Sequence, residues 1–358
     1  MVKFILTLIL LSTLQVLAFS AENIGIFTFG DSIFDAGNNH FNQKIGAQAD
    51  FPPYGSSYFP YPTGRFTNGR TVVDFICEYL GIDFQQPYLE AYLTVANGTL
   101  HSYPSNGINF ASAGSGVLSE TNKFEGAMSL ELQLRQFRSL VLEGQIDRDL
   151  IRNSLFFLEA GSNDIFNYFM TNSSQTPKAY VQTMLYEMQS IVDDLYLLGA
   201  RRIALFSLGP VGCVPARAML SETTPQRTCF EPMNVMAKRY NHGLHKLVES
   251  KNRRYPGAVL TYGDVFNIVH HIRLHPEKYG FFDVNDACCG SGILRGELQC
   301  GRGSIYQVCD NPDEFMFWDF FHPTEHTYRI LASELWSGSS ARIRPVNLKF
   351  LATHLKRA

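Results

Sequence analysis

A seryl hydroxyl, an imidazole and a carboxylate occupy positions in this sequence where they could act together in hydrolysis. Asp319 precedes His322 by three residues, so its carboxylate can reach the near ring nitrogen of the imidazole within one turn. That contact fixes the tautomer and leaves the far nitrogen free to accept a proton from a hydroxyl. Ser32 follows Gly30 and Asp31 at the end of an apolar run and supplies such a hydroxyl. The pattern predicts Ser32 as a nucleophile and His322 as its general base.

Two further polar loops could stabilise the oxygen that becomes negative during attack. One is the glycine-rich segment Gly107–Gly116, and the other is Gly161–Asp164. The backbone amides of Ser32 and Gly114 and the side-chain amide of Asn163 are the expected donors. Each loop also has a structural alternative, because glycines permit close backbone packing and the second loop could cap a helix. The joint occurrence of these blocks at the ends of apolar runs favours catalysis.

These blocks are expected to lie on the loops of a layered α/β fold. Apolar runs that predict buried strands cover 24–29, 107–111, 154–159, 202–207 and 258–262. Helical patterns cover 71–80, 177–198 with Gly199 as the cap, 232–254 and 324–336. Continuous apolar strands suit a parallel sheet covered on both faces, and their alternation with helices indicates α/β layers. Such sheets carry their working groups beyond the carboxyl ends of the strands.

The N-terminal 20 residues resemble a secretory signal peptide. Lys3 precedes the apolar run Phe4–Leu17, and Ala18–Ser20 offers small residues for cleavage near Ser20 or Ala21. The alternative is a membrane anchor, but the run is shorter than the roughly 20 residues that span a bilayer. The sequence therefore predicts a mature protein that is soluble, extracellular or vacuolar, and not integral to a membrane.

Residues 21–358 are expected to form a single domain, since neither an internal repeat nor a low-complexity linker divides them. Apolar residues make up 45% of the chain, which is enough for a sizeable core. The net charge of −3 and the lack of a Lys/Arg run argue against nucleic acid as a partner. The aromatic segment 51–70 lacks periodicity and is expected to be a long ordered loop or lid. The segment 283–311, which carries four cysteines, is expected to be a second, disulfide-stapled loop.

The cysteine count is seven, so at least one thiol is unpaired. Cys77 lies in the apolar stretch 72–77 and is the expected free thiol. Cys213 and Cys229 close a short loop and are expected to pair in an exported protein. The other four cysteines can pair in three ways, which the sequence leaves open. Zinc binding is disfavoured, because the cluster lacks two spaced Cys-x-x-Cys pairs.

Together, the polar blocks closely resemble those of the plant GDSL esterase/lipase family within the SGNH hydrolase superfamily. Four blocks carry the resemblance: Phe29–Asn39, Gly107–Gly116, Gly161–Asp164 and Asp319–Glu325. Two additional segments, Tyr61–Arg70 and Ala287–Gly290, are similar to plant members. The likeness extends from about Ile24 to Trp336.

The resemblance implies a three-layer α/β/α sandwich with a central parallel sheet, similar to flavodoxin. It implies that Ser32 is the nucleophile, His322 the base and Asp319 the group that orients it. It assigns the oxyanion hole to Ser32, Gly114 and Asn163. Neither a cofactor nor a metal is expected, and the implied partner is a small-molecule or lipid ester.

Several other features received weaker interpretations. Ile33 stands where the family motif usually has leucine, and its equal volume predicts little consequence. The sequence has no Gly-x-Ser-x-Gly, which disfavours a nucleophile-elbow hydrolase. His271 and His275 have helical spacing but lack the glutamate of a zinc-protease motif, so they are expected on the surface. Asp31 and Asp35 are expected to fix the nucleophile loop by hydrogen bonds.

Asn97 and Asn172 stand in glycosylation sequons. The aromatic residues of 51–66 could line an acyl pocket or could serve ordinary packing. The same site could also transfer the acyl group to an alcohol, and a non-catalytic secreted binding or defence protein is a further alternative. The motif does not select among wax, cutin, lipid, acetyl-sugar and phenolic esters, because the pocket walls determine that choice.

Overall fold

The computed structural model describes residues 24–171, 173–220, 228–302 and 305–353. The expected signal peptide at 1–20 and the sequon asparagine Asn172 lie outside these ranges. Within them, every helix is too short or too polar to cross a bilayer.

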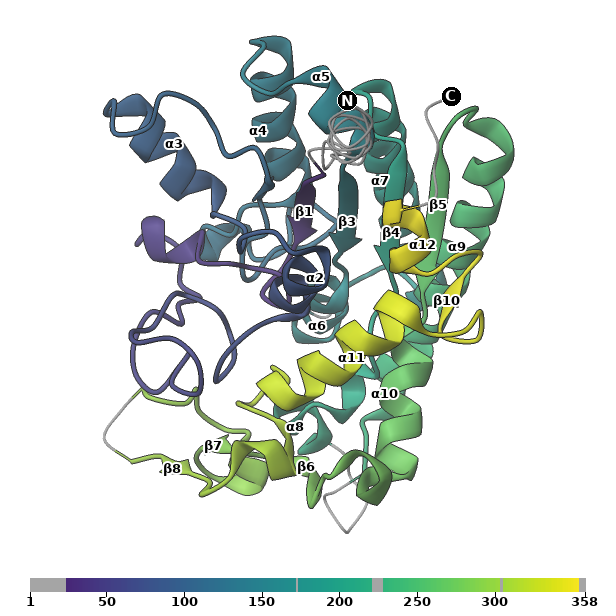
Figure 1. Cartoon of the computed structure of the whole chain (residues 1–358). Helices are drawn as coiled ribbons and strands as arrows, with labels where there is room; N and C mark the ends of the chain where they lie inside the picture. The colour runs from purple at the N-terminus through teal and green to yellow at the C-terminus, as the bar shows by residue number, and fades with distance from the viewer. Residues whose placement is uncertain (1–23, 172, 221–227, 303–304, 354–358) are drawn as a thin grey trace, which may run out of the picture.

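A six-stranded sheet forms the centre of the molecule, with the strand order β2-β1-β3-β4-β5-β10 (Figure 1). The strands are β1 (Ile26–Gly30), β2 (Gly107–Asn109), β3 (Leu155–Glu159), β4 (Arg202–Phe206), β5 (Val259–Gly263) and β10 (Ile343–Arg344). The first five are parallel, and β10 runs antiparallel to β5 at the edge. The order 2-1-3-4-5 is that of flavodoxin-like sheets, so the predicted fold class is confirmed. The antiparallel edge strand was not predicted, because two residues are too few to show a pattern.

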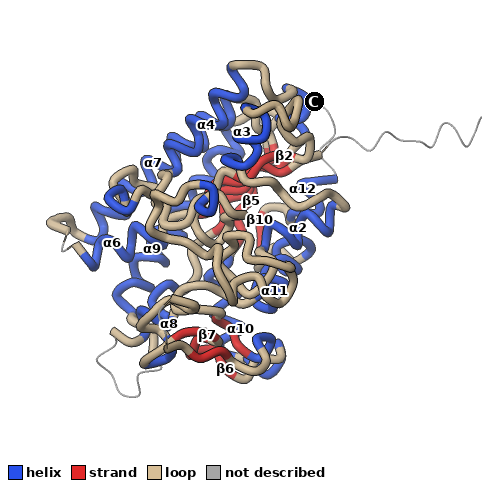
Figure 2. The backbone as a smooth tube through the Cα atoms, turned by 90° about the vertical axis from the view of Figure 1, so that its left-hand side faces the viewer, coloured by secondary structure: helices blue, strands red, loops and turns tan. Residues whose placement is uncertain are grey.

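Helices cover both faces of the sheet. In Figure 2, α4, α7 and α9 lie on one side of the strands, and α2, α11 and α12 lie on the other. The helices are α2 (Val72–Leu80), α3 (Tyr88–Ala96), α4 (Leu130–Leu142), α5 (Arg148–Asn153), α6 (Ser162–Met170), α7 (Pro177–Leu197), α8 (Pro215–Ala218), α9 (Glu231–Arg254), α10 (Val265–Leu274), α11 (Glu325–Ser337) and α12 (Leu348–Thr353). The four predicted helices are therefore confirmed. Gly199 follows the actual cap, Leu198, and adopts the positive φ that ends α7.

The two faces hold separate apolar clusters, because side chains alternate along each strand. Phe27 and Phe29 of β1 point into the cluster that contains α4, α7 and α9. Ile26 points into the opposite cluster, which contains α2, α10, α11 and α12. Phe137 of α4 packs 5.2 Å from the ring of Phe27, centroid to centroid. Burial of such side chains contributes about 1.5–3 kcal/mol each and fixes the sheet between its helices.

The segment 51–70 is an ordered loop without helix or strand, as predicted. Arg65 attaches it to α2, since its Nε and Nη2 donate to the two carboxylate oxygens of Asp74, each at 2.8 Å. Its Nη1 donates to the carbonyl of Ala36 at 3.0 Å. The same buried guanidinium thus connects the loop, the start of α2 and the chain that follows Ser32.

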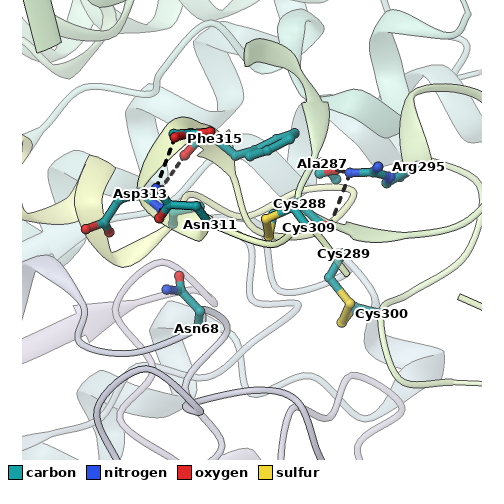
Figure 3. The surroundings of a disulfide bond; sticks show 12 residues. Asn68, Ala287, Cys288, Cys289, Arg295, Cys300, Cys309, Asn311, Asp313 and Phe315 are labelled. Atoms are coloured by element: carbon teal, nitrogen blue, oxygen red, sulfur yellow. Dashed lines mark hydrogen bonds between the residues drawn. A yellow bond between two sulfur atoms is a disulfide. The ribbon is translucent and has the colours of Figure 1, made fainter. Parts of the chain in front are cut away.

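Six cysteines form disulfides, and Cys77 is the buried free thiol, as predicted. The expected pair Cys213–Cys229 is present. The four remaining cysteines pair as Cys288–Cys309 and Cys289–Cys300, which resolves the choice among three arrangements (Figure 3).

Two small sheets accompany these disulfides. One pairs β6 (Asp283–Ala287) with β9 (Phe315–Phe317), and the other pairs β7 (Cys289–Gly290) with β8 (Gln307–Val308). The backbone N–H of Cys289 donates to the carbonyl of Trp318 at 2.7 Å. The stapled region therefore holds the chain immediately before Asp319.

Candidate active site

The predicted site residues lie on loops at one edge of the sheet. Ser32 follows β1, Gly114 lies in the loop after β2, and Asn163 lies in the first turn of α6 after β3. These strands are neighbours, and the order of connection reverses between β1 and β3, where doubly wound sheets bind ligands. His322 reaches the same place from the loop between β9 and α11.

Ser32, His322 and Asp319 form a continuous chain of hydrogen bonds. The Oγ of Ser32 lies 2.8 Å from Nε2 of His322, although 290 positions separate the two residues. Nδ1 of His322 lies 2.7 Å and 2.9 Å from the two carboxylate oxygens of Asp319. An ionised carboxylate can only accept, so Nδ1 carries the proton and Nε2 accepts from the hydroxyl. This arrangement permits transfer of the seryl proton to the imidazole.

Asp319 is fully buried, and several groups besides His322 donate hydrogen bonds to its carboxylate. It accepts hydrogen bonds from the backbone N–H groups of Phe321 and His322 at 2.9 and 2.8 Å, and from the Tyr54 hydroxyl at 2.5 Å. Burial acts to raise the pKa of Asp319, but the charge and hydrogen bond of His322, with the hydrogen bond of Tyr54, outweigh burial. The pKa therefore lies below its ordinary value, and the carboxylate stays ionised behind the imidazole.

The expected oxyanion donors face one cavity together with His322. Among the described residues, the backbone N–H groups of Ser32 and Gly114 donate to no protein acceptor. Gly114 has a φ of +83°, which accounts for glycine at this position. Asn163 donates from Nδ2 to the carbonyl of Ser115 at 2.9 Å, and the same nitrogen makes a longer, 3.4 Å hydrogen bond to the carboxylate of Asp31.

Asp35 joins the nucleophile loop to the Gly114 loop. One of its oxygens accepts from the backbone N–H groups of Gly37 and Asn38, each at 2.7 Å. The other accepts from the backbone N–H of Ala113 at 2.9 Å. Burial raises the pKa of Asp35 to about 6. The predicted structural role of Asp35 is confirmed, and this role extends to the residue beside Gly114.

Asp31 and Glu159 form a buried pair of carboxyl groups beneath Ser32. Asp31 accepts from the backbone N–H of Ile33 at 3.0 Å, which shapes the turn that presents Ser32. Burial raises the pKa of Asp31 to about 6, although the hydrogen bond from the Ile33 N–H works against this shift. Burial and the charge of Asp31 raise the pKa of Glu159 well above its usual value. Burial beside another carboxyl group therefore disfavours ionisation of Glu159.

Asp164 connects the start of α6 to the loop beyond Gly114. Its carboxylate accepts from the backbone N–H groups of Val117 and Leu118, both at 2.9 Å, and from the Thr121 hydroxyl at 2.7 Å. The segments that bear Gly114 and Asn163 are thus held together by a buried carboxylate. From the sequence, the only structural role considered for Asp164 was to cap a helix.

The sequence predicted no role for Tyr54, and it indicated Glu159 only as the start of a polar loop. Tyr54 lies in the aromatic loop, and its partner Asp319 is 265 positions away. Glu159 ends the third apolar run, where its ionisable side chain was the available signal. Within the segment 51–66, Phe66 lines the cavity, whereas Tyr61 is 69% exposed.

The cavity above Ser32 has a volume of about 400 Å³. His271 and His275 lie outside it, with ring centroids 4.8 Å apart. The ranges that the structure describes contain no group of three His, Cys, Asp or Glu side chains able to hold a metal ion. Asn97 is exposed at the end of α3, so its side chain is open to modification.

A hydroxyl bonded to an imidazole that is bonded in turn to a buried carboxylate is the constellation of serine hydrolases. The model of the GDSL-like Lipase/Acylhydrolase family matches residues 26–335. The chain belongs to this family and is a carboxylic ester hydrolase.

Several known proteins are similar over nearly their whole length. GDSL esterase/lipase 6 of Arabidopsis thaliana is 56% identical over 98% of this chain and 96% of its own length. A GDSL lipase of Tanacetum cinerariifolium is 35% identical over 93% of this chain and 88% of its own. Among solved structures, a catalytic mutant of an acetylxylan esterase from Geobacillus stearothermophilus covers 94% of this chain and 99% of its own, with 14% identity and a TM-score of 0.41.

Proposed function

We propose that the protein hydrolyses carboxylic esters in two steps through an acyl-enzyme on Ser32. The observation that carries the proposal is the 2.8 Å contact between Ser32 Oγ and His322 Nε2, with Asp319 bonded to the opposite ring nitrogen. In the first step, Oγ attacks the ester carbonyl carbon while Nε2 takes the hydroxyl proton. The resulting imidazolium is stabilised by the ionised Asp319.

The carbonyl oxygen becomes negative as the tetrahedral intermediate forms. The unbonded backbone N–H groups of Ser32 and Gly114 are the donors assigned to it, together with the Asn163 amide hydrogen that makes the long, 3.4 Å bond to Asp31. Collapse of the intermediate breaks the bond to the alcohol oxygen, which receives the proton from His322. Water then attacks the acyl-enzyme, with Nε2 again taking the proton, and the carboxylic acid leaves while Ser32 regains its hydrogen.

The chain is also proposed to act as one domain of residues 21–358 after removal of a signal peptide. The three disulfides support an extracellular or vacuolar location, since such bonds persist in oxidising compartments. Sequencing the N-terminus of the protein recovered from plant tissue would test the cleavage near Ser20 or Ala21.

Replacement of Ser32 tests the chemistry. We expect Ser32→Ala to lower kcat for p-nitrophenyl acetate by roughly 10⁴-fold or more, because the nucleophile is lost. We expect Asn163→Ala to lower kcat by roughly 10²–10³-fold, because it removes one oxyanion donor of several. Ser139→Ala, on the exposed face of α4, serves as the control. A fluorophosphonate should label the wild type and Ser139→Ala but not Ser32→Ala. Wild-type turnover by Ser32→Ala would refute the mechanism.

A further inference from the structure

Arg217 lines the cavity that contains the catalytic groups, and of the described residues in the cavity wall it is the only lysine or arginine. It belongs to α8, whose Ala216 N–H donates to the carbonyl of Phe320 at 2.9 Å. Phe320 lies two residues before His322. The short helix that bears Arg217 is therefore attached directly to the loop that carries the general base.

Two aromatic rings from the catalytic segments pack against the guanidinium of Arg217. Its Cζ lies 4.7 Å from the ring centroid of Phe166 and 5.0 Å from that of Phe321. Phe321 directly precedes His322, and Phe166 lies one turn after Asn163 in α6. The guanidinium therefore lies beside the segments that hold the general base and an oxyanion donor.

Arg217 has no carboxylate partner within the ranges that the structure describes. Its Nη2 donates to the thioether sulfur of Met170 at 3.5 Å, which is a weak acceptor, and its Nε is buried without a hydrogen bond. Burial lowers the pKa of Arg217. The buried Arg65 differs, because both its Nε and its Nη2 donate to Asp74, whose charge outweighs burial and raises the pKa of Arg65.

A partly buried guanidinium without a counter-charge favours the binding of an anion. Burial removes part of the water around the charge, which costs free energy unless an opposite charge takes the place of that water. Unpaired, desolvated charges of this kind are concentrated at functional sites. The planar N–H donors of arginine match the two oxygens of a carboxylate. A single guanidinium also balances the single charge of a carboxylate, whereas a phosphate monoester carries about 1.5 to 2 negative charges.

We propose that Arg217 binds an ionised carboxylate of the substrate, so that the preferred esters are those that carry a free acid group. The inference rests on the function proposed above, because the ester must react at Ser32. Arg217 is then a specificity-determining residue, since it contacts a part of the substrate that does not react. The partly exposed rings of Phe166 and Phe321 offer apolar surface beside the guanidinium, so an acid group on an aromatic ring suits this place.

The test compares esters that differ in charge but hardly in shape. On the alcohol side, the pair is para-acetoxybenzoate and para-acetoxybenzamide. On the acyl side, the pair is the p-nitrophenyl half-ester of terephthalic acid and its carboxamide. The acid-to-amide ratio of kcat/KM is divided by the ratio of the uncatalysed hydrolysis rates, which cancels the intrinsic reactivity of the two esters. The pair that responds identifies the half of the substrate that faces Arg217.

The wild-type enzyme should show a corrected acid-to-amide ratio of about 10 to 100 in at least one pair, because a hydrogen bond between charged groups has this effect on kcat/KM. Arg217→Gln should bring the ratio close to one, mainly by raising KM for the acid. Arg217→Lys keeps the charge and should retain part of the preference. If the guanidinium only packed against the two rings, Lys would act like Gln, and both esters would be affected equally.

Arg135→Gln is the matched control. Arg135 is exposed on α4, 3.8 Å from Glu131, so this variant removes the same charge at a distance from the cavity and should leave the ratio unchanged. Two outcomes would overturn the proposal: a corrected wild-type ratio near one in both pairs, which requires no variant to fold, or a folded Arg217→Gln with the wild-type ratio. In either case, turnover of both esters that is lost in Ser32→Ala would leave the hydrolytic mechanism intact, so the two failures are distinguishable.

Discussion

Replacement of Asp35 by asparagine tests whether this buried carboxylate positions the Gly114 amide. The two side chains have the same size, but asparagine replaces one acceptor oxygen with an NH2 donor. If the amide oxygen keeps the bonds to Gly37 and Asn38, the NH2 group faces the N–H of Ala113. Two donors then oppose each other beside Gly114.

The size of the effect follows from the bond that is lost. Ala113 is fully buried, so its N–H is left without a partner, which costs about 1–3 kcal/mol. The loop can relieve this cost by moving away from Asp35, which displaces the adjacent Gly114 amide. If the whole cost appears in the transition state, kcat falls by about 5- to 150-fold. We expect a result in this range, with KM for a small ester little changed.

The assay is steady-state hydrolysis of p-nitrophenyl acetate at pH 8, where wild-type Asp35, with a pKa of about 6, is ionised. Asp50→Asn is the matched control, because within the described part of the chain the Asp50 carboxylate bonds the side chains of His40 and Gln43 on the neighbouring loop. Its kcat should equal that of the wild type. A folded Asp35→Asn enzyme with wild-type kcat would refute the reasoning, since the Gly114 amide would then need no support from Asp35.

Three other predictions concern charge and burial. Asp319→Asn should lower kcat by roughly 10⁴-fold with an unchanged circular dichroism spectrum, because the Nδ1 proton loses its ionised acceptor. Asp31 and Asp35 have pKa values raised to about 6 by burial, so their stabilising contribution is complete below about pH 3.8 and is lost as the pH rises through 6. The free energy of unfolding measured with urea should therefore fall by about 1 kcal/mol per carboxyl between pH 5 and 7.5, and this fall should be smaller in Asp35→Asn. Cys77 has a pKa raised by burial and should react with iodoacetamide only in step with unfolding, so labelling of the native protein at the free-thiol rate would contradict its buried position.

The strands could be predicted because their sequence pattern follows from their burial on both faces. The run that contains Phe27 and Phe29 is mostly apolar, since one cluster receives these rings and the other receives Ile26. Thr28, between the two rings, is buried and donates to the side chain of Gln85. The edge strand β10 lacks this signal. Its pairing with β5 depends on how the chain returns after α11, which no local pattern encodes.

The core of the candidate site could be predicted because three chemically distinct groups recur in recognisable local patterns. The contacts that support these groups could not be predicted from the sequence. Tyr54 and Asp319 meet only in the folded protein, and the proximity of the carboxyl groups of Asp31 and Glu159 depends on the register that pairs β1 with β3. The bond from Asn163 to the Ser115 carbonyl is likewise a product of tertiary packing.

The separation of 290 positions between Ser32 and His322 has a consequence for biosynthesis. A nascent chain displays its serine and the Gly114 and Asn163 loops long before the ribosome adds the imidazole. On the proposed mechanism, every such intermediate is inert toward esters. Activity can begin only after the loop between β9 and α11 has brought His322 to Ser32, so ester cleavage itself reports that synthesis has passed this loop.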